Sequence, residues 1–241
     1  MFLSRLPVLF VALLCLTAQA QTTEQAPRPK NISAELWEAL QEMDRRSSEI
    51  KTLRARFVRH RHTPLLREPL VSEGMVLIKG DRVRWETEAP SPSTTLIGDD
   101  QVRIYQPEDR RLEVYEIEDR ASRFGAGPLP RLTDMLDDFS IKQMSRAELF
   151  RASDEDDDGA GDGLALRLTP KREAVADNVQ AIDMLIEPKS GRLLRLRMRS
   201  DESQWTAYRF VEHEVNVDLP DDAFTLDLPP DVEVVRTERE Q

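Results

Sequence analysis

Few side chains in this sequence could carry acid–base or metal chemistry, and the histidines are the first candidates. His60 and His62 point the same way on an expected strand, as two metal ligands could. Their neighbours Arg59 and Arg61 are cations, which disfavour a bound metal ion. His213 lies on a distant strand. We therefore interpret the paired histidines as solvated side chains near an exposed strand end.

The densest group of carboxylates is the acidic run that begins at Asp154. Acids at the first, third and fifth places and glycine at the sixth resemble a calcium-binding loop. The twelfth place, which should hold a bidentate glutamate, is Ala165, and the eighth is Gly161. We predict a solvated acidic loop over residues 154–163, without a specific calcium site.

Motifs for enzymatic chemistry are absent from the sequence. There is no G-x-S-x-G elbow, no H-E-x-x-H, no glycine-rich phosphate loop and no dinucleotide fingerprint. No nucleophile–base pair can be named. We predict a protein that is not an enzyme and has no catalytic residue, metal or cofactor. Its formal charge of -11 also disfavours attraction to nucleic acid.

The amino-terminal segment predicts export. Arg5 precedes an apolar run, Leu6 to Leu16, that is shorter than the roughly 20 residues of a membrane-spanning helix. A small-x-small pattern ends at Ala20, so we place signal-peptide cleavage after that residue. The alternative is a lipoprotein acylated at Cys15, but Leu14 fills the place where a lipobox requires a small residue.

Cleavage after Ala20 determines the character of the remaining chain. Cys15 is the only cysteine, so the mature protein has no disulfide and no thiolate site. Export without disulfides favours a domain with its own hydrophobic core. We divide the chain into a signal peptide (1–20), a flexible leader (21–32), one domain (33–236) and a tail (237–241).

Apolar periodicity indicates one amphipathic helix followed by a long series of strands. Ser33 is a suitable N-cap for a helix over residues 34–51, with Leu36 and Leu40 on its apolar stripe. From Leu53 to the break at Pro64 the period is two residues, as in a strand with one buried face. Further strands are predicted at 71–79, 82–88, 94–97, 102–106, 112–117, 164–168, 179–186, 193–198 and 205–217.

Short connections without βαβ alternation favour an antiparallel sheet or an open barrel. The run Met75 to Ile78 is apolar at consecutive positions, so the sheet should be covered on both faces. Residues 132–139 are predicted to form a second helix, and with the helix over 34–51 it would fill the inside of a curved sheet. Its apolar stripe is Leu132, Met135, Leu136 and Phe139.

Several short motifs occur in an order that resembles one protein family. After the first helix they are Leu53-x-Ala-x-Phe57, a strand beginning near Gly74, Val83-Arg84-Trp85 before Pro90, Gly98-Asp99-Asp100, Tyr105-Gln106-Pro107 and Phe224-Thr-Leu-Asp-Leu-Pro229. In this order, from about Leu36 to Val234, the chain resembles the LolA family of periplasmic lipoprotein carriers, whose barrel LolB and RseB share.

The resemblance implies an α+β, mainly β fold: an unclosed antiparallel β-barrel with helices covering an apolar cavity. It implies a periplasmic monomer whose cavity holds the acyl chains of lipoproteins or a similar lipid. The cargo would come from an inner-membrane lipoprotein-release complex and pass to an outer-membrane acceptor. The residues expected to line the cavity and its lid are Phe57, Met75, Leu77, Val83, Trp85, Leu96, Leu132, Met135, Leu136 and Phe139.

Two positions depart from the family pattern. Arg59 stands where members often have glutamine, and Gly80 stands where well-studied members have the arginine that latches the closed lid. The latch therefore does not carry over to this chain. An alternative function is an RseB-like regulator that binds an anti-sigma factor, but such proteins have a further C-terminal domain, so we favour the carrier.

Overall fold

The structure is a computed structural model that describes residues 28–116, 131–149, 163–177, 179–201 and 203–237. The predicted signal peptide, most of the leader, the loop before Arg131, the acidic loop up to Gly163 and most of the tail lie outside these ranges. Ile32, the last residue assigned to the leader, is described and is buried in the core. None of the described helices combines the length and apolar character needed to cross a membrane.

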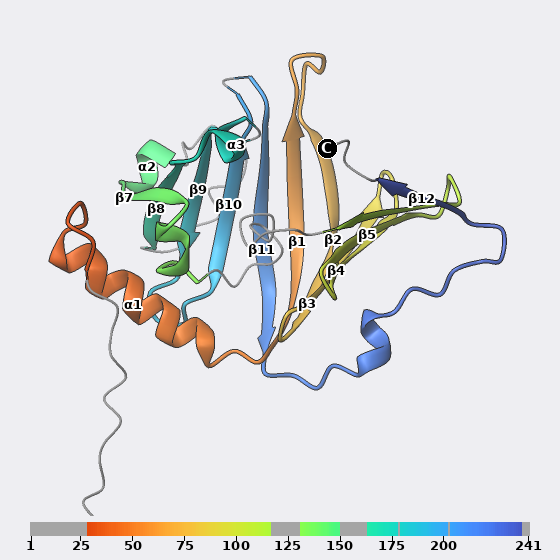
Figure 1. The fold of residues 1–241 in the computed structure, drawn as a ribbon, viewed down its shortest axis with the longest axis horizontal. Coiled ribbons are helices and arrows are strands. Elements are labelled where there is room, and N and C mark those ends of the chain that lie inside the picture. The colour runs from red at the N-terminus through yellow and green to blue at the C-terminus, as the bar shows by residue number, and fades with distance from the viewer. Residues whose placement is uncertain (1–27, 117–130, 150–162, 178, 202, 238–241) are drawn as a thin grey trace, which may run out of the picture.

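All twelve strands described belong to one open sheet (Figure 1). Their order in space is β12-β6-β5-β4-β3-β2-β1-β11-β10-β9-β8-β7, so β12 and β7 are the edges. The strands are β1 (Thr52–His62), β2 (Leu70–Lys79), β3 (Arg82–Ala89), β4 (Ser93–Gly98), β5 (Gln101–Gln106), β6 (Arg111–Glu116), β7 (Phe139–Gln143), β8 (Leu164–Pro170), β9 (Ala181–Ile186), β10 (Leu193–Arg199), β11 (Trp205–Val215) and β12 (Glu233–Thr237).

The two-residue period predicted for β1 defines the inner face of the sheet. Leu53, Ala55 and Phe57 are all buried and belong to the main hydrophobic core. Since residues paired across antiparallel strands share a face, Phe210 of β11 and Gly74 of β2, which pair with Phe57, lie on this inner face as well. Eleven strands pair antiparallel, as predicted, and β12 is parallel to β6.

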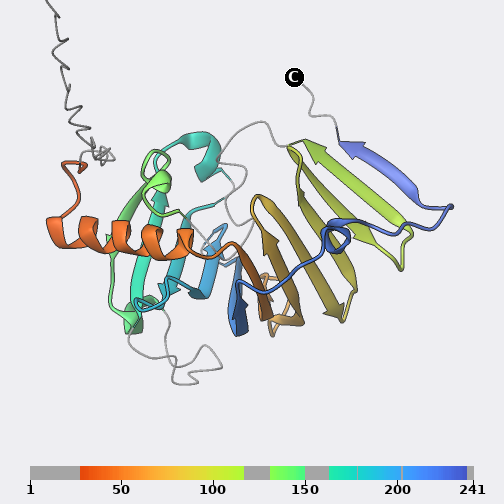
Figure 2. The same ribbon diagram turned by 90° about the horizontal axis from the view of Figure 1, so that it is seen from below.

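Helix α1 (Ala34–Ser48) packs across the inner face of the half formed by β8, β9 and β10 (Figures 1 and 2). Ser33 caps it as predicted, since its hydroxyl accepts a hydrogen bond from the Leu36 amide at 3.1 Å. Leu36, Leu40 and Met43 supply the buried stripe. The helix ends three residues earlier than the predicted Lys51, because β1 begins at Thr52.

The outer face of β2 and β3 is covered by the C-terminal segment, which includes the short 3-10 helix η3 (Asp221–Phe224). Leu219 and Phe224 pack against Leu77 there, with Met75 at the edge of the cluster. The Arg84 guanidinium donates to the carbonyl oxygens of Ala223 and Thr225 at 3.2 and 2.8 Å. This confirms that β2 is covered on both faces.

The outer face of the other half carries a buried ion cluster beside the short helix α2 (Arg146–Leu149). Asp183 of β9 is fully buried and accepts hydrogen bonds from Arg167 at 2.7 and 3.1 Å and from Arg199 at 2.9 Å. Arg197 donates to the Leu149 carbonyl oxygen at the end of α2. Paired charges therefore replace apolar packing at this part of the outer face.

The predicted helix over residues 132–139 is wrong. The segment forms only a 3-10 turn, η2 (Asp134–Leu136), and Phe139 already begins strand β7, where it pairs with Pro170. A short turn followed by a strand can bury the same four apolar residues that a helix would bury. The edge strands β7 and β12 and the small helix α3 (Glu173–Ala176) were not predicted.

Candidate functional site

The centre of the inner face is an aromatic cluster from three strands. Phe57 of β1 contacts Trp85 of β3 edge-on at 5.2 Å between ring centroids, and Tyr208 of β11 lies 5.9 Å from Phe57. Tyr208 and Trp85 are 5.4 Å apart, and Phe210 stacks parallel to Tyr208 at 6.1 Å. Such offset and edge-on pairs are favourable beyond the area that they bury.

Gly74 of β2 makes room for this cluster. A Cβ atom at Gly74 would lie 2.8 Å from the Phe57 ring and 1.8 Å from the Glu86 carbonyl oxygen. The ring of Phe57 therefore lies directly over the β2 backbone, where any other residue would displace it. The pairing of β2 with β3 also shifts register between Glu73 and Gly74, which bends the sheet at this point.

From Trp85 the inner face continues across β4, β5 and β6, where it is only partly covered. Cross-strand pairing puts Ile97, Val102, Ile104 and Tyr115 on the same face as Trp85 and Val83. Trp85 and these four residues are all partly exposed, whereas Leu96, Leu112 and Val114 on the opposite face are buried. Helix α1 crosses the other half of the sheet (Figure 2). Among the described residues, no helix or strand packs over this part of the inner face, and its apolar side chains stay partly exposed.

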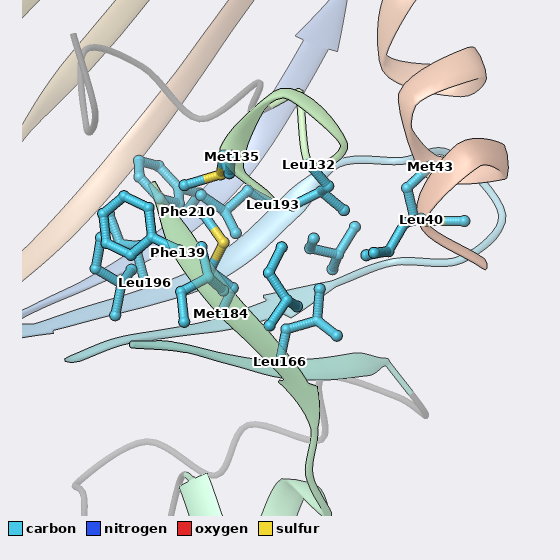
Figure 3. Packing of buried hydrophobic residues seen from close by; sticks show 14 of the residues in the cluster. Leu40, Met43, Leu132, Met135, Phe139, Leu166, Met184, Leu193, Leu196 and Phe210 are labelled. Carbon is cyan, nitrogen blue, oxygen red and sulfur yellow. The ribbon is translucent and has the colours of Figure 1, made fainter. Parts of the chain in front are cut away.

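The segment 131–138 covers the inner face at the boundary between the two halves. Leu132, Met135 and Leu136 are buried in the main core together with Phe139. In Figure 3, Met135 and Phe139 point toward Phe210, beside the side chains of Met184 and Leu196. The predicted lid residues therefore do gather on the inner face, although they are not one helical stripe.

A buried carboxylate on α1 holds this segment. One Asp44 oxygen accepts a hydrogen bond from the Leu132 amide at 2.6 Å, and the other accepts from the Thr133 amide at 2.9 Å and from the Thr133 hydroxyl. Asp44 is 8% exposed, so these bonds form in a largely dry environment. Asp44 thus attaches the start of the segment to α1.

A second attachment lies at the other end of the same segment. The Lys171 ammonium donates to the Leu136 carbonyl oxygen at 2.6 Å, and Arg172 forms an ion pair with Asp138 at 2.9 Å. The Lys171 amide also donates to the Asp138 carbonyl oxygen. The segment is fixed by polar contacts at both ends and by apolar packing between them. We refer to residues 131–138 as the cover segment.

Seven of the ten residues predicted to line the site lie in or against the core of the inner face, and three do not. Phe57, Val83, Leu132, Met135, Leu136 and Phe139 are core members and Trp85 packs against them. Met75, Leu77 and Leu96 are on the outer face, because Leu77 pairs through Arg84 to Leu96 and packs on Leu219. Their assignment to the inner face is wrong, since an apolar residue in a strand that is covered on both sides can face either way.

The sequence-based search missed two parts of the site. Tyr208 and Phe210 alternate along β11 in the pattern that identified β1, so they could have been found. Asp44 could also have been recognised from the sequence, because it lies four residues after Leu40 on the buried stripe of α1. A charged residue on a buried stripe requires a partner, and that partner is the cover segment.

In a comparison with protein-family models, the model "Outer membrane lipoprotein carrier protein LolA" matches residues 48–227. The chain belongs to the LolA family. A curated relative, the "Outer-membrane lipoprotein carrier protein" of Chromohalobacter salexigens, is 25% identical over 163 residues, which are 67% of this chain and 69% of that protein. Members of the family are carrier proteins rather than enzymes.

Solved structures similar to this LolA-family chain have low sequence identity to it. An uncharacterized conserved protein from Thermus thermophilus matches with a TM-score of 0.52 and 13% identity, over 84% of this chain and 99% of that chain. A chain of the Pseudomonas aeruginosa MucA/MucB complex matches with a TM-score of 0.44 and 11% identity. The match covers 80% of this chain and 61% of that chain. The second likeness is too low to carry a functional argument.

Proposed function

We propose that this protein is a periplasmic carrier that holds the acyl chains of a lipoprotein, or of a similar lipid, against the inner face of its sheet. In this proposal the cargo comes from an inner-membrane release complex and is delivered to an outer-membrane acceptor, and the carrier acts as a monomer without catalysis. The supporting observation is the row of partly exposed side chains Ile97, Val102 and Tyr115 that continues the inner face from Val83, next to Trp85 and near the attached cover segment.

The physical requirement for such a carrier is that it keeps methylene groups out of water. Each buried methylene contributes about 0.8 kcal/mol, so a long chain needs an extended apolar surface rather than a few contacts. Ile97, Val102 and Ile104 offer that surface beside the aromatic cluster. Cargo that extends toward Phe210 would have to displace the cover segment, whose residues occupy that part of the inner face.

Tryptophan emission gives a direct test of where an acyl chain binds. A variant with Trp37 and Trp205 replaced by phenylalanine retains Trp85 as its single indole. We expect a saturable change in its emission on titration with an acylated peptide, because the ligand would replace water around the partly exposed ring. An unchanged spectrum at saturation would contradict the assignment of Trp85.

A matched pair of variants on β5 separates the two faces of the sheet. Ile104 lies on the inner face and its neighbour Tyr105 on the outer face. We expect Ile104→Asp to weaken binding of the acylated peptide strongly and Tyr105→Asp to leave it nearly unchanged. Equal affinities of the two variants for the acylated peptide would contradict the proposal that the acyl chain binds the inner face. Mass spectrometry of lipids and lipoproteins that co-purify from the periplasm would then identify the natural cargo.

A further inference from the structure

The tip of the β1–β2 hairpin concentrates exposed apolar side chains. Among the described residues, four of the six large hydrophobic side chains that are strongly exposed lie here: Leu65 (94%), Leu66 (44%), Leu70 (43%) and Val71 (44%). Isolated exposed hydrophobic residues are ordinary, but a contiguous group on an otherwise polar surface usually marks a contact site. The tip is defined as residues 61–71, which carry a formal charge of +1 from Arg61, Arg67 and Glu68.

The tip is also a positively charged part of an acidic protein. Exposed Arg61 and Arg67 flank the two leucines, with His60 and His62 at the end of β1, and Glu68 is the only acid within the tip. The whole chain carries a formal charge of -11. The tip, where apolar side chains are most exposed, is therefore opposite in charge to the protein as a whole.

The geometry of the tip keeps these side chains away from the core. The β1–β2 ladder continues to the pair Arg61–Leu70, and the Leu66 amide closes a turn on the Thr63 carbonyl oxygen at 3.0 Å. Pro64 and Pro69 stand on either side of the leucines and restrict the backbone there. Figure 1 shows the hairpin ending at the opposite end of β1 from helix α1.

We propose that this hairpin tip binds the surface of an anionic lipid bilayer. Leu65 and Leu66 enter the interface between headgroups and acyl chains, and the Arg61 and Arg67 guanidinium groups lie at the level of the lipid phosphates. Apolar insertion combined with cationic attraction is the physical basis of interfacial binding. Exposed leucines flanked by arginines match the layering of such a surface, where phosphates lie above acyl chains, so we assign a lipid surface as the occupant.

This proposal concerns where the protein meets a membrane and does not depend on what the inner face binds. The experiment is flotation of the full chain with vesicles of phosphatidylcholine, alone or mixed with phosphatidylglycerol. We expect the protein to float with the anionic vesicles and much less with the neutral ones. Absence of binding to the anionic vesicles would overturn the proposal and would leave a protein partner as the occupant of the tip.

Variants of the tip and of other surfaces make the test specific. Replacing Leu65 and Leu66 together by serine should weaken binding at least about tenfold, since removal of one fully inserted leucine already costs about that factor. Arg61→Gln with Arg67→Gln should abolish the preference for anionic vesicles. Val234→Ser, which alters another exposed apolar residue, should bind as the unmodified protein does.

The inner-face variant Ile104→Asp distinguishes this surface from the cargo site. If the tip is the contact, Ile104→Asp binds vesicles normally even where it fails to bind an acylated peptide. If vesicle binding is lost with Ile104→Asp and retained when both leucines are serine, lipids are being taken up by the inner face and the proposal is wrong.

Discussion

At the scale of single residues, polar and small side chains set the positions of the apolar ones. Asp44 attaches the cover segment from the buried side of α1, where Leu40 and Met43 lie. Gly74 lets the Phe57 ring lie over β2. Asp44 and Gly74 are residues at which a single substitution should have a large and local effect.

Asp44→Ala should release the cover segment. The change leaves the Leu132 and Thr133 amides without their acceptor, and each unsatisfied buried donor costs about 1–3 kcal/mol. We expect reduced stability in chemical unfolding and faster hydrogen exchange at these two amides. The control is Glu42→Gln on the same helix, where the carboxylate forms exposed ion pairs with Arg45 and Arg46 and little change is expected. Unaltered exchange at Leu132 in Asp44→Ala would contradict the fastening role.

Gly74→Ala should destabilise the fold more than the addition of a single methyl group usually does. The new methyl group would overlap the Glu86 carbonyl oxygen at 1.8 Å, so β2 and β3 would have to separate. We expect a loss of about 3 kcal/mol of folding free energy or more, measured by denaturant unfolding. Gly80→Asn is the control, because a Cβ there meets nothing within 4 Å and asparagine tolerates the left-handed backbone at φ 63°.

His213 should make folding stability depend on pH. Burial lowers the pKa of His213 below its ordinary value of 6.5, while its ring nitrogen lies 3.2 Å from the Leu193 carbonyl oxygen. A lowered pKa means that the folded state favours the neutral ring, so its stabilising contribution is present above pH 6.5 and is lost as the pH falls through the lowered value. His213→Gln should reduce this acid sensitivity of the thermal midpoint. The same sensitivity in His213→Gln and the unmodified protein would refute the assignment.

At the scale of elements, the sequence predicted local strands well and long-range arrangements poorly. The alternation in β1 and the Gly80 turn between β2 and β3 are local signals, and both are confirmed. The parallel pairing of β12 with β6 joins residues more than a hundred positions apart, for which no local pattern exists. The sequence predicted that something covers the outer face of β2. It did not identify Leu219 and Phe224 as the residues that pack there.

The attachment of η3 to the β2–β3 turn should be sensitive to acid and salt. Asp221 pairs with Arg82 at 2.6 Å and Lys79 at 3.0 Å, and the hydrogen bonds from these two cations lower the Asp221 pKa below its ordinary value of 3.8. The contribution of this group is therefore present above pH 3.8 and is lost as the pH falls through the lowered value. Both ion pairs are exposed, so salt screens them.

Asp221→Asn provides the corresponding test. We expect faster hydrogen exchange in residues 219–225 at neutral pH and a loss of the salt dependence seen in the unmodified protein. Asp222→Asn, a neighbouring exposed carboxylate, is the matched control. Identical exchange in both variants would show that apolar packing of Leu219 and Phe224 alone holds the segment.

At the scale of the whole molecule, one continuous sheet joins a half covered by α1 to a half whose inner face is partly exposed. Phe57, Tyr208 and Phe210 belong to the central strands that connect the two halves. Sequence periodicity identified all the strands except the edge strands β7 and β12. It could not show which faces remain exposed, because exposure depends on what packs over a strand. The partly exposed side chains Val102 and Ile104 illustrate this point.

This division predicts a gradient of local stability. Amides in β8, β9 and β10 should exchange with solvent most slowly, because these strands hold many buried apolar side chains. Amides in β4 and β5 should exchange faster and should become protected when an acylated ligand binds. Hydrogen exchange followed by mass spectrometry, with and without ligand, measures both effects. Uniform protection across the sheet would contradict the proposed open half.

The two edges of the open sheet have a consequence for how the protein behaves among other polypeptides. An unpaired edge can template strands from another chain and so start aggregation. Here both edge strands, β7 and β12, are only five residues long, and Lys142 and Arg236 lie within them. Short edges that carry a charge are poor templates. The sheet can therefore stay unclosed, with one face available for binding, without recruiting the backbones of extended chains that it meets.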